Sequence, residues 1–135
     1  MGTGRGILER FFGAWSDGKA DVLDEVLADD AVVHYGDTPN MGREGLKQLA
    51  EAFFEAFPDG EVTLGEIVEN GDRVAATWTY TGTHTGTLFG IPPTGKRFRA
   101  DGMNMERVQD GRIVEHWSVF DQMTAFRQLG LAPES

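Results

Sequence analysis

Apolar side chains in the first part of the chain recur every three or four positions. This spacing predicts amphipathic helices over residues 7–15, 20–27 and 43–57, each with one apolar face. Pro58 ends the third of these helices. Between the second and the third, residues 31–35 (AVVHY) are rich in β-branched side chains and predict a short strand.

From residue 61 onward the helical period gives way to an alternation of apolar and polar positions, which predicts strands. An Asn-Gly pair and an Asp-Gly pair mark two hairpin turns, whereas residues 85–96, with three Gly and two Pro, predict a loop. The predicted strands are residues 61–69, 73–83, 97–108 and 113–120, and a last helix covers residues 122–129.

The order of these elements defines the expected fold. Two helices, a strand and a third helix precede four mostly antiparallel strands and a short closing helix, which is the pattern of an α+β protein. We expect one domain over residues 1–135, with three N-terminal helices packed on one face of a curved sheet. Such a molecule would form a cone whose open end makes a pocket.

The last predicted strand brings one carboxylate into an unusual setting. Regular alternation places Asp121 at the end of a mostly apolar row. A buried carboxylate is costly unless it is paired or protonated, and the same setting raises its pKa toward a value useful for proton transfer. We therefore expect Asp121 near the centre of any chemistry, the alternative being that it caps the helix that begins at Gln122. The row comprises Ile113, Glu115, Trp117, Val119 and Asp121, and the opposite row comprises Val114, His116, Ser118 and Phe120.

Composition and charge argue against several classes of protein. A net charge of −10 argues against nucleic acid or an anionic membrane as partner, and no apolar run approaches the ~20 residues of a membrane-spanning helix. The chain has no cysteine, so disulfides and Cys-ligated metals are excluded, and we expect a cytoplasmic protein. Its three histidines lack the HxxxH or HxH spacing of a metal site, so no metal ion is expected.

The second half of the chain carries short motifs in a fixed order, namely GDRVA, GTHTG, GIPPTGK, DGRIVEHW, Asp121 and QLG. In these motifs the chain resembles the SnoaL-like polyketide cyclases of the NTF2-like superfamily, and its first half matches more loosely through ILERFFGAWSDGK and AVVH. The resemblance implies an NTF2-like cone and an intramolecular aldol condensation on a hydrophobic polyketide ester, without metal or cofactor. It also implies an aspartate as general acid and base, which the Trp-x-x-x-Asp spacing places at Asp121.

Aldol chemistry also needs a hydrogen-bond donor for the enolate oxygen. The candidates are His116, His84, Asn104 and the indole N–H of Trp117. His84 ends a strand before the glycine-rich loop, where it either binds substrate or holds the loop by a hydrogen bond. His116 lies on the face opposite Asp121 if strand pairing is regular, and a β-bulge near Trp117 would reverse that. The sequence leaves open the turn register that would bring Asn104 opposite Trp117.

Aromatic side chains are the expected walls of a pocket for a flat polycyclic ligand. Trp117 is assigned to the pocket, Trp78 to the core or the pocket, and Trp15 to a position from which it can face the cavity. His34 and Tyr35 point to opposite sides of a short strand, so at most one of them lines the cavity, and His34 is the candidate for binding substrate. The GIPPTGK loop lacks the spacing of a phosphate-binding loop and is interpreted as a rigid lip over the mouth of the cone.

Two further predictions concern the sheet. Glu115 and Glu106 are expected to form structural ion pairs across the last hairpin, with Arg107 or Arg112 as partner. A homodimer is expected to form through the outer face of the sheet, where aromatic side chains would otherwise be exposed. The residues expected on that face are Val114, His116 and Phe120.

Other functions of the same fold are the alternatives. Aligned with ketosteroid isomerases, the chain has Phe11 at the position of their oxyanion tyrosine and Tyr35 at that of their general base, so both catalytic groups are missing. Asp101, Arg99 and Asp121 supply the residue types of an epoxide-hydrolase-like site, although no spacing demands that function. The third alternative is a protein that binds a hydrophobic small molecule without turning it over, with Asp121 paired and permanently charged.

Overall fold

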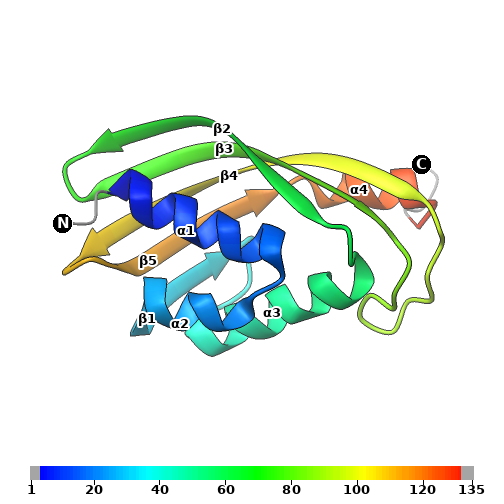
Figure 1. The fold of residues 1–135 in the computed structure, drawn as a ribbon, viewed down its shortest axis with the longest axis horizontal. Coiled ribbons are helices and arrows are strands. Elements are labelled where there is room, and N and C mark those ends of the chain that lie inside the picture. Colours follow the sequence, from blue (N-terminus) through cyan, green and yellow to red (C-terminus); the bar gives the residue numbers. More distant parts are fainter. Residues whose placement is uncertain (1–3, 132–135) are drawn as a thin grey trace.

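The computed structural model describes residues 4–131 and confirms an α+β fold with helices packed on a curved, mostly antiparallel sheet (Figure 1). The elements are α1 (Gly4–Asp17), the short 3-10 helix η1 (Ala20–Val22), α2 (Leu23–Val26), β1 (Leu27–Tyr35), α3 (Gly42–Ala56), β2 (Glu61–Asn70), β3 (Arg73–Thr83), β4 (Arg97–Gln109), β5 (Arg112–Phe120) and α4 (Gln122–Leu129).

Five strands form the sheet in the order β1-β5-β4-β3-β2. β1 runs parallel to β5, and every other neighbouring pair is antiparallel. α1 packs against β2 and α3 against β1, so these helices cover one face of the sheet (Figure 1). α4 contacts β4 at the end of the sheet where β5 runs into that helix.

The segment 20–27 differs from its prediction as one helix. A 3-10 turn and a single α-helical turn share this stretch, and Leu27 already belongs to β1. Leu27 pairs with Ile113 of β5, and both side chains are completely buried. Burial against the sheet therefore overrides the local helical spacing, and the strand begins earlier than predicted.

The hairpin between β4 and β5 contains a β-bulge that decides which side chains of β5 face the helices. Gln109 pairs with Arg112 across the two-residue Asp-Gly turn, but the register shifts next to Arg107, so that Val114 is the extra residue on β5. Ile113 and His116 are consequently both buried, although they are three positions apart. The predicted faces of β5 are wrong beyond the bulge, because a one-residue slip moves every following side chain to the other side.

Two buried clusters form the core. The larger joins α1, α2 and α3 to the sheet and includes Leu8, Leu23, Leu46 and Ile113. The smaller joins the end of α3 to β3, β4 and α4 and includes Phe57, Tyr80, Phe98 and Leu129. Trp15 and Trp78 pack against both clusters, so large aromatic side chains wall the space between them.

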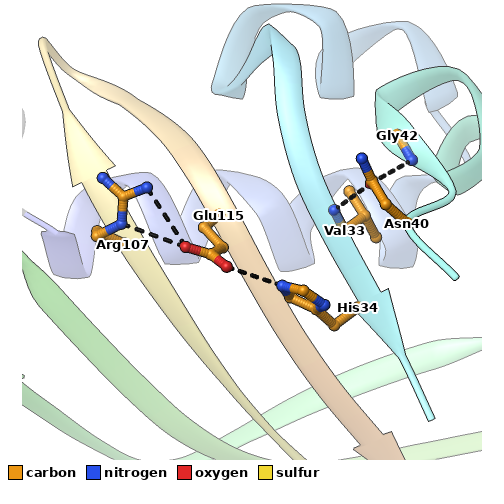
Figure 2. Close-up of polar contacts among 6 residues, drawn as sticks. All are labelled: Val33, His34, Asn40, Gly42, Arg107 and Glu115. Carbon is orange, nitrogen blue, oxygen red and sulfur yellow. Dashed lines mark hydrogen bonds and ion pairs between the residues drawn. The ribbon is translucent and has the colours of Figure 1, made fainter. Parts of the chain in front are cut away.

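The outer face of the sheet carries a polar network (Figure 2). Glu115 Oε1 accepts a hydrogen bond from Arg107 Nη2 at 3.3 Å, and Glu115 Oε2 lies 2.8 Å from His34 Nε2. The His34 ring stacks on Trp117 with 5.4 Å between ring centroids, and the Arg73 guanidinium lies 5.2 Å from the Trp117 ring centroid. The predicted pair of Glu115 with Arg107 is confirmed.

Candidate active site

An apolar cavity of about 50 Å³, the inner cavity, lies between the helices and the inner face of the sheet. Aromatic side chains supply much of its wall, and three of its lining residues, Tyr35, Tyr80 and His116, are titratable. The lining residues are Phe11, Phe12, Trp15, Tyr35, Leu46, Leu49, Phe53, Val62, Trp78, Tyr80, Asn104, His116, Ser118 and Phe120.

The buried carboxylate of Glu106 contacts His116, which lines the inner cavity. Glu106 of β4 is the register partner of His116 on β5, and His116 Nδ1 lies 2.5 Å from Glu106 Oε2. Asn104, two residues earlier on the same face of β4, donates a hydrogen bond from Nδ2 to Glu106 Oε1. Glu106 is completely buried and His116 is 2% exposed. Burial raises the pKa of the Glu106 carboxyl, and its bonds to His116 and Asn104 oppose that shift.

Among the residues that line the inner cavity, four further polar atoms have no hydrogen-bond partner within residues 4–131. They are the indole N–H groups of Trp15 and Trp78, the hydroxyl of Tyr80 and Oδ1 of Asn104, and all four are buried. Buried donors and acceptors are normally satisfied, so unpaired groups at a cavity wall point to a ligand or water as the missing partner. The set offers donors for carbonyl or enolate oxygens and one acceptor for a hydroxyl.

A second space of about 240 Å³, the end cavity, lies between α4, the end of α3 and the loop 84–96. Tyr35, Leu49, Phe53 and Phe120 line both cavities, which are therefore neighbours. The rest of its lining is Phe57, Leu88, Phe89, Phe98, Gln122, Ala125, Phe126 and Leu129. The loop that was predicted to form a lip contributes Leu88 and Phe89 to this wall.

Asp121 has a different setting from the one expected. Its side chain is exposed at the N-terminus of α4, where it accepts hydrogen bonds from Thr124 Oγ1 at 2.6 Å and from Thr124 N at 3.1 Å. These bonds to the Thr124 hydroxyl and amide lower the pKa of the Asp121 carboxyl. Asp121 lines neither cavity, because the bulge in β5 turns its row outward. The helix-cap alternative describes its position.

His84 is completely buried but also lines neither cavity. Its Nδ1 lies 3.1 Å from Thr94 Oγ1, and its backbone bonds to Lys96 and Gly95 tie the two ends of the loop together. The His84 ring packs on Phe57 with 5.5 Å between centroids. This geometry matches the interpretation that His84 holds the loop rather than a ligand.

The remaining candidates divide between the two faces of the sheet. His116, Asn104, Trp15 and Trp78 line the inner cavity. Trp117 and His34, expected in the pocket, lie on the outer face, where they stack on one another. Tyr35, the neighbour of His34 on β1, lines both cavities instead. His116 and Phe120 were expected on the outer face and lie on the inner one, again because of the bulge.

Glu106 has a different role from the one predicted from the sequence. It was expected to pair with an arginine, yet it bonds to His116 and Asn104. In β4 the buried positions alternate strictly with more exposed ones from Phe98 to Glu106, so Asn104 and Glu106 share the inward face. Two adjacent inward positions of that strand are polar, which indicates a buried polar network rather than a surface pair.

The residues of an epoxide-hydrolase-like site are not brought together around the cavities. Asp101 and Arg99 are exposed and line neither cavity, and the Asp101 carboxylate accepts a hydrogen bond from Thr79 Oγ1 at 2.7 Å. Across residues 4–131, no group of three or more His, Asp or Glu side chains is placed to hold a metal ion. No helix in this same range is long and apolar enough to cross a membrane.

Comparison with known proteins identifies the class. The family model of the SnoaL-like polyketide cyclases matches residues 6–129. The chain is 33% identical to aklanonic acid methyl ester cyclase DauD from Streptomyces sp. (strain C5), over 92% of this chain and 80% of that protein. It is 32% identical to nogalonic acid methyl ester cyclase from Streptomyces nogalater, over 87% and 90% of the two chains.

Solved structures agree with this assignment. IdmH from Streptomyces antibioticus superposes with a TM-score of 0.82 and 38% identity, covering 93% of this chain and 97% of IdmH. A protein from Catenulispora acidiphila with a ketosteroid isomerase-like fold gives a TM-score of 0.79 at 18% identity, covering 97% and 96% of the two chains, which shows the fold alone. The chain belongs to the SnoaL-like polyketide cyclase family and has its NTF2-like cone.

Proposed function

We propose that this protein closes a ring in the methyl ester of a polycyclic polyketide acid by cofactor-free acid/base chemistry. The observation that carries the proposal is an apolar, aromatic cavity whose lining residues include buried, unpaired hydrogen-bonding groups and the imidazole of a buried imidazole–carboxylate pair. The substrate class comes from the relatives named above, which the chain matches over most of the length of both partners.

The two cavities suit different parts of such a molecule. The end cavity, at about 240 Å³, is the larger and is lined almost entirely by apolar side chains that can lie against fused rings. The inner cavity, at about 50 Å³, has room only for the edge of a ligand, and it holds the polar groups. The ring system therefore occupies the end cavity, and the reacting edge passes Phe53 and Phe120 into the inner one.

An aldol ring closure needs a base for a carbon-bound proton, a stabiliser for the enolate oxygen and an acid for the new alkoxide. The Trp15 and Trp78 indole N–H groups and the Tyr80 hydroxyl are the available donors for the enolate oxygen. Burial raises the pKa of Tyr80, so its hydroxyl keeps the proton that it donates. The resemblance gives the proton transfer to Asp121, which lies outside both cavities.

The test is conversion of defined substrates by the purified protein. Aklanonic acid methyl ester and nogalonic acid methyl ester are incubated separately with the enzyme, and the products are followed by liquid chromatography and mass spectrometry. A ring-closed isomer of unchanged mass is expected with at least one ester. Parallel calorimetric titration separates turnover from binding, because binding of both esters without any isomer would support the non-catalytic alternative and refute a cyclase.

We also propose that two copies associate through the outer face of the sheet. Met103 and Val119 are register partners on that face, and they are 56% and 61% exposed. Neighbouring exposed apolar side chains on one face of a sheet are typical of an interface. Light scattering should give a dimer mass for the wild type and a monomer mass for Val119→Glu, whereas Met123→Glu on α4 should stay dimeric. A monomeric wild type would refute this.

We further propose that the protein works in the cytoplasm. The absence of cysteine from the sequence supports a reducing compartment, where disulfides give no advantage. Fractionation of cells that produce the full-length protein should recover it with cytoplasmic markers, and recovery in the culture medium would contradict the assignment.

A further inference from the structure

We propose that His116, held and electrostatically balanced by Glu106, is the proton-transfer group of this cavity. The inference rests on the proposed ring-closing function and names the residues that perform it. Glu106 acts through His116 and is a positioning residue, whereas His116 faces the reacting atoms. Asp121, which family resemblance alone would select, has no part in this scheme.

The orientation of the imidazole supports this role. His116 lines the inner cavity, and its Nδ1 is engaged by Glu106 Oε2 at 2.5 Å. No hydrogen bond from residues 4–131 engages its second nitrogen, Nε2. A carboxylate that accepts from Nδ1 fixes the tautomer in which Nε2 carries a free electron pair. The ring of Phe11, 5.2 Å away between centroids, packs on the imidazole and restricts its rotation.

The cost of the arrangement indicates that it is not simply structural. A carboxylate that is completely buried loses its hydration and is tolerated only with partners. Glu106 has two partners, His116 and Asn104, and neither is an arginine or a lysine. An apolar pair across β4 and β5 would fill the same space without that cost. A buried carboxylate–imidazole pair beside an open cavity is an arrangement that proton-transfer sites use.

The proposed steps balance without an added reagent. Nε2 of neutral His116 takes a proton from a substrate carbon that lies between two carbonyl groups, which leaves an enolate and an imidazolium beside Glu106. The enolate carbon then attacks a second carbonyl carbon of the same molecule, forming the new C–C bond and an alkoxide. The imidazolium returns its proton from Nε2 to the alkoxide oxygen. No atom is gained or lost, so the product is an isomer of the substrate.

The surroundings of His116 define what a pH profile can report. Glu106 faces it from β4, Tyr80 and Tyr35 line the same cavity from β3 and β1, and Asn104 and Ser118 add uncharged polar groups to the lining. Burial raises the pKa of Tyr35 and of Tyr80, so both stay neutral across the working range of an enzyme. The coupled pair of His116 and Glu106 is therefore the remaining candidate in this cavity for a limb of the profile.

The experiment compares four variants with the wild type by kcat and KM across pH. We expect His116→Gln to lower kcat by about 10²–10⁴-fold with little change in KM, as loss of a general base does. Glu106→Gln should lower kcat less and move the acid limb to lower pH, because a neutral amide no longer stabilises the imidazolium. Glu115→Gln, on the opposite face of β5, is the matched control, and Asp121→Asn should keep kcat within about threefold.

Two further measurements distinguish a loss of catalysis from a loss of folding. His116→Ala, which leaves a gap of imidazole size, should regain activity when free imidazole is added. The ¹⁵N shifts of His116 in the unliganded wild type should show a protonated Nδ1 and a free Nε2, and Glu106→Gln should disturb that tautomer. Retained kcat in His116→Gln, or its collapse in Asp121→Asn alone, would overturn the inference while leaving the cyclase intact. A wild type that turns over no ester would remove the cyclase itself, and the catalytic role of His116 with it.

Discussion

Gly86 lies where the loop 84–96 crosses the C-terminal end of α3, and a side chain there should destabilise the fold. The backbone N–H groups of Thr85 and Gly86 both donate to the carbonyl of Ala56 at 3.1 Å. A Cβ atom at position 86 would lie 1.9 Å from the carbonyl oxygen of Glu55 and 2.8 Å from its carbonyl carbon. That carbonyl belongs to the last turn of a helix held by the buried side chains of Ala56 and Phe57.

The size of the effect of Gly86→Ala follows from these contacts. The helix end cannot retreat, so the loop must move away by about 1 Å or more. Two hydrogen bonds of about 0.5–1.5 kcal/mol each are then weakened or lost. The residual overlap adds about 1–3 kcal/mol. The free energy of unfolding should therefore fall by about 2–6 kcal/mol, a large share of the 5–15 kcal/mol typical of a domain.

Urea unfolding followed by tryptophan fluorescence measures this change. Gly13→Ala is the matched control, because a Cβ at that position of α1 meets nothing within 4 Å. The control should gain about 0.5–1 kcal/mol from the higher helix propensity of alanine. If the free energy of unfolding of Gly86→Ala lies within 0.5 kcal/mol of the wild-type value, the loop does not pack closely on α3. The end cavity would then lack a defined wall on that side.

Two other substitutions test the contribution of Asp59 to stability and the contribution of Phe89 to substrate binding. Asp59 accepts hydrogen bonds from Thr83 N and Oγ1, and these bonds lower the pKa of its carboxyl. The carboxylate therefore stabilises the fold above the unfolded-state pKa of about 3.9, and this stabilisation is lost as pH falls through the folded-state pKa. The stability difference between wild type and Asp59→Asn should shrink below about pH 4; a difference constant to pH 2 would contradict this. Phe89 is 65% exposed and has a φ of 48°, a backbone conformation that glycine adopts more easily. Phe89→Gly should therefore change the free energy of unfolding by under about 1 kcal/mol and raise KM several-fold. An unchanged KM would show that Phe89 does not contact the substrate.

The sequence was sufficient for the fold because its periodicities are strong. Helical spacing and strict alternation marked the long elements, and Asn-Gly and Asp-Gly marked the hairpins. The exception was the segment 20–27, where Leu27 joins the sheet because it packs against Ile113, a contact that lies far away in the sequence. Local spacing carries no information about such a partner.

The site was predicted less well, and one residue explains most of the difference. Val114 is the bulged residue of β5, and nothing in its immediate sequence distinguishes it from an ordinary strand residue. Regular alternation therefore placed Trp117 and Asp121 inside and His116 outside, the reverse of what the structure shows. Asp121 also fitted two descriptions, a buried acid and a helix cap, and only the three-dimensional position of Thr124 distinguishes them.

The parallel pairing of β1 with β5 has a consequence for how the chain folds during synthesis. His34 and Glu115, which touch across that pair, are 81 positions apart in sequence. Within residues 4–131, β1 is an edge strand with β5 as its one neighbour in the sheet, so it has no ladder to join until β5 has left the ribosome. Until then α1 and α3 must shield its apolar side chains, and contacts of such long range are slow to form. A nascent chain stalled before β5 should accordingly recruit chaperones that release it once β5 emerges.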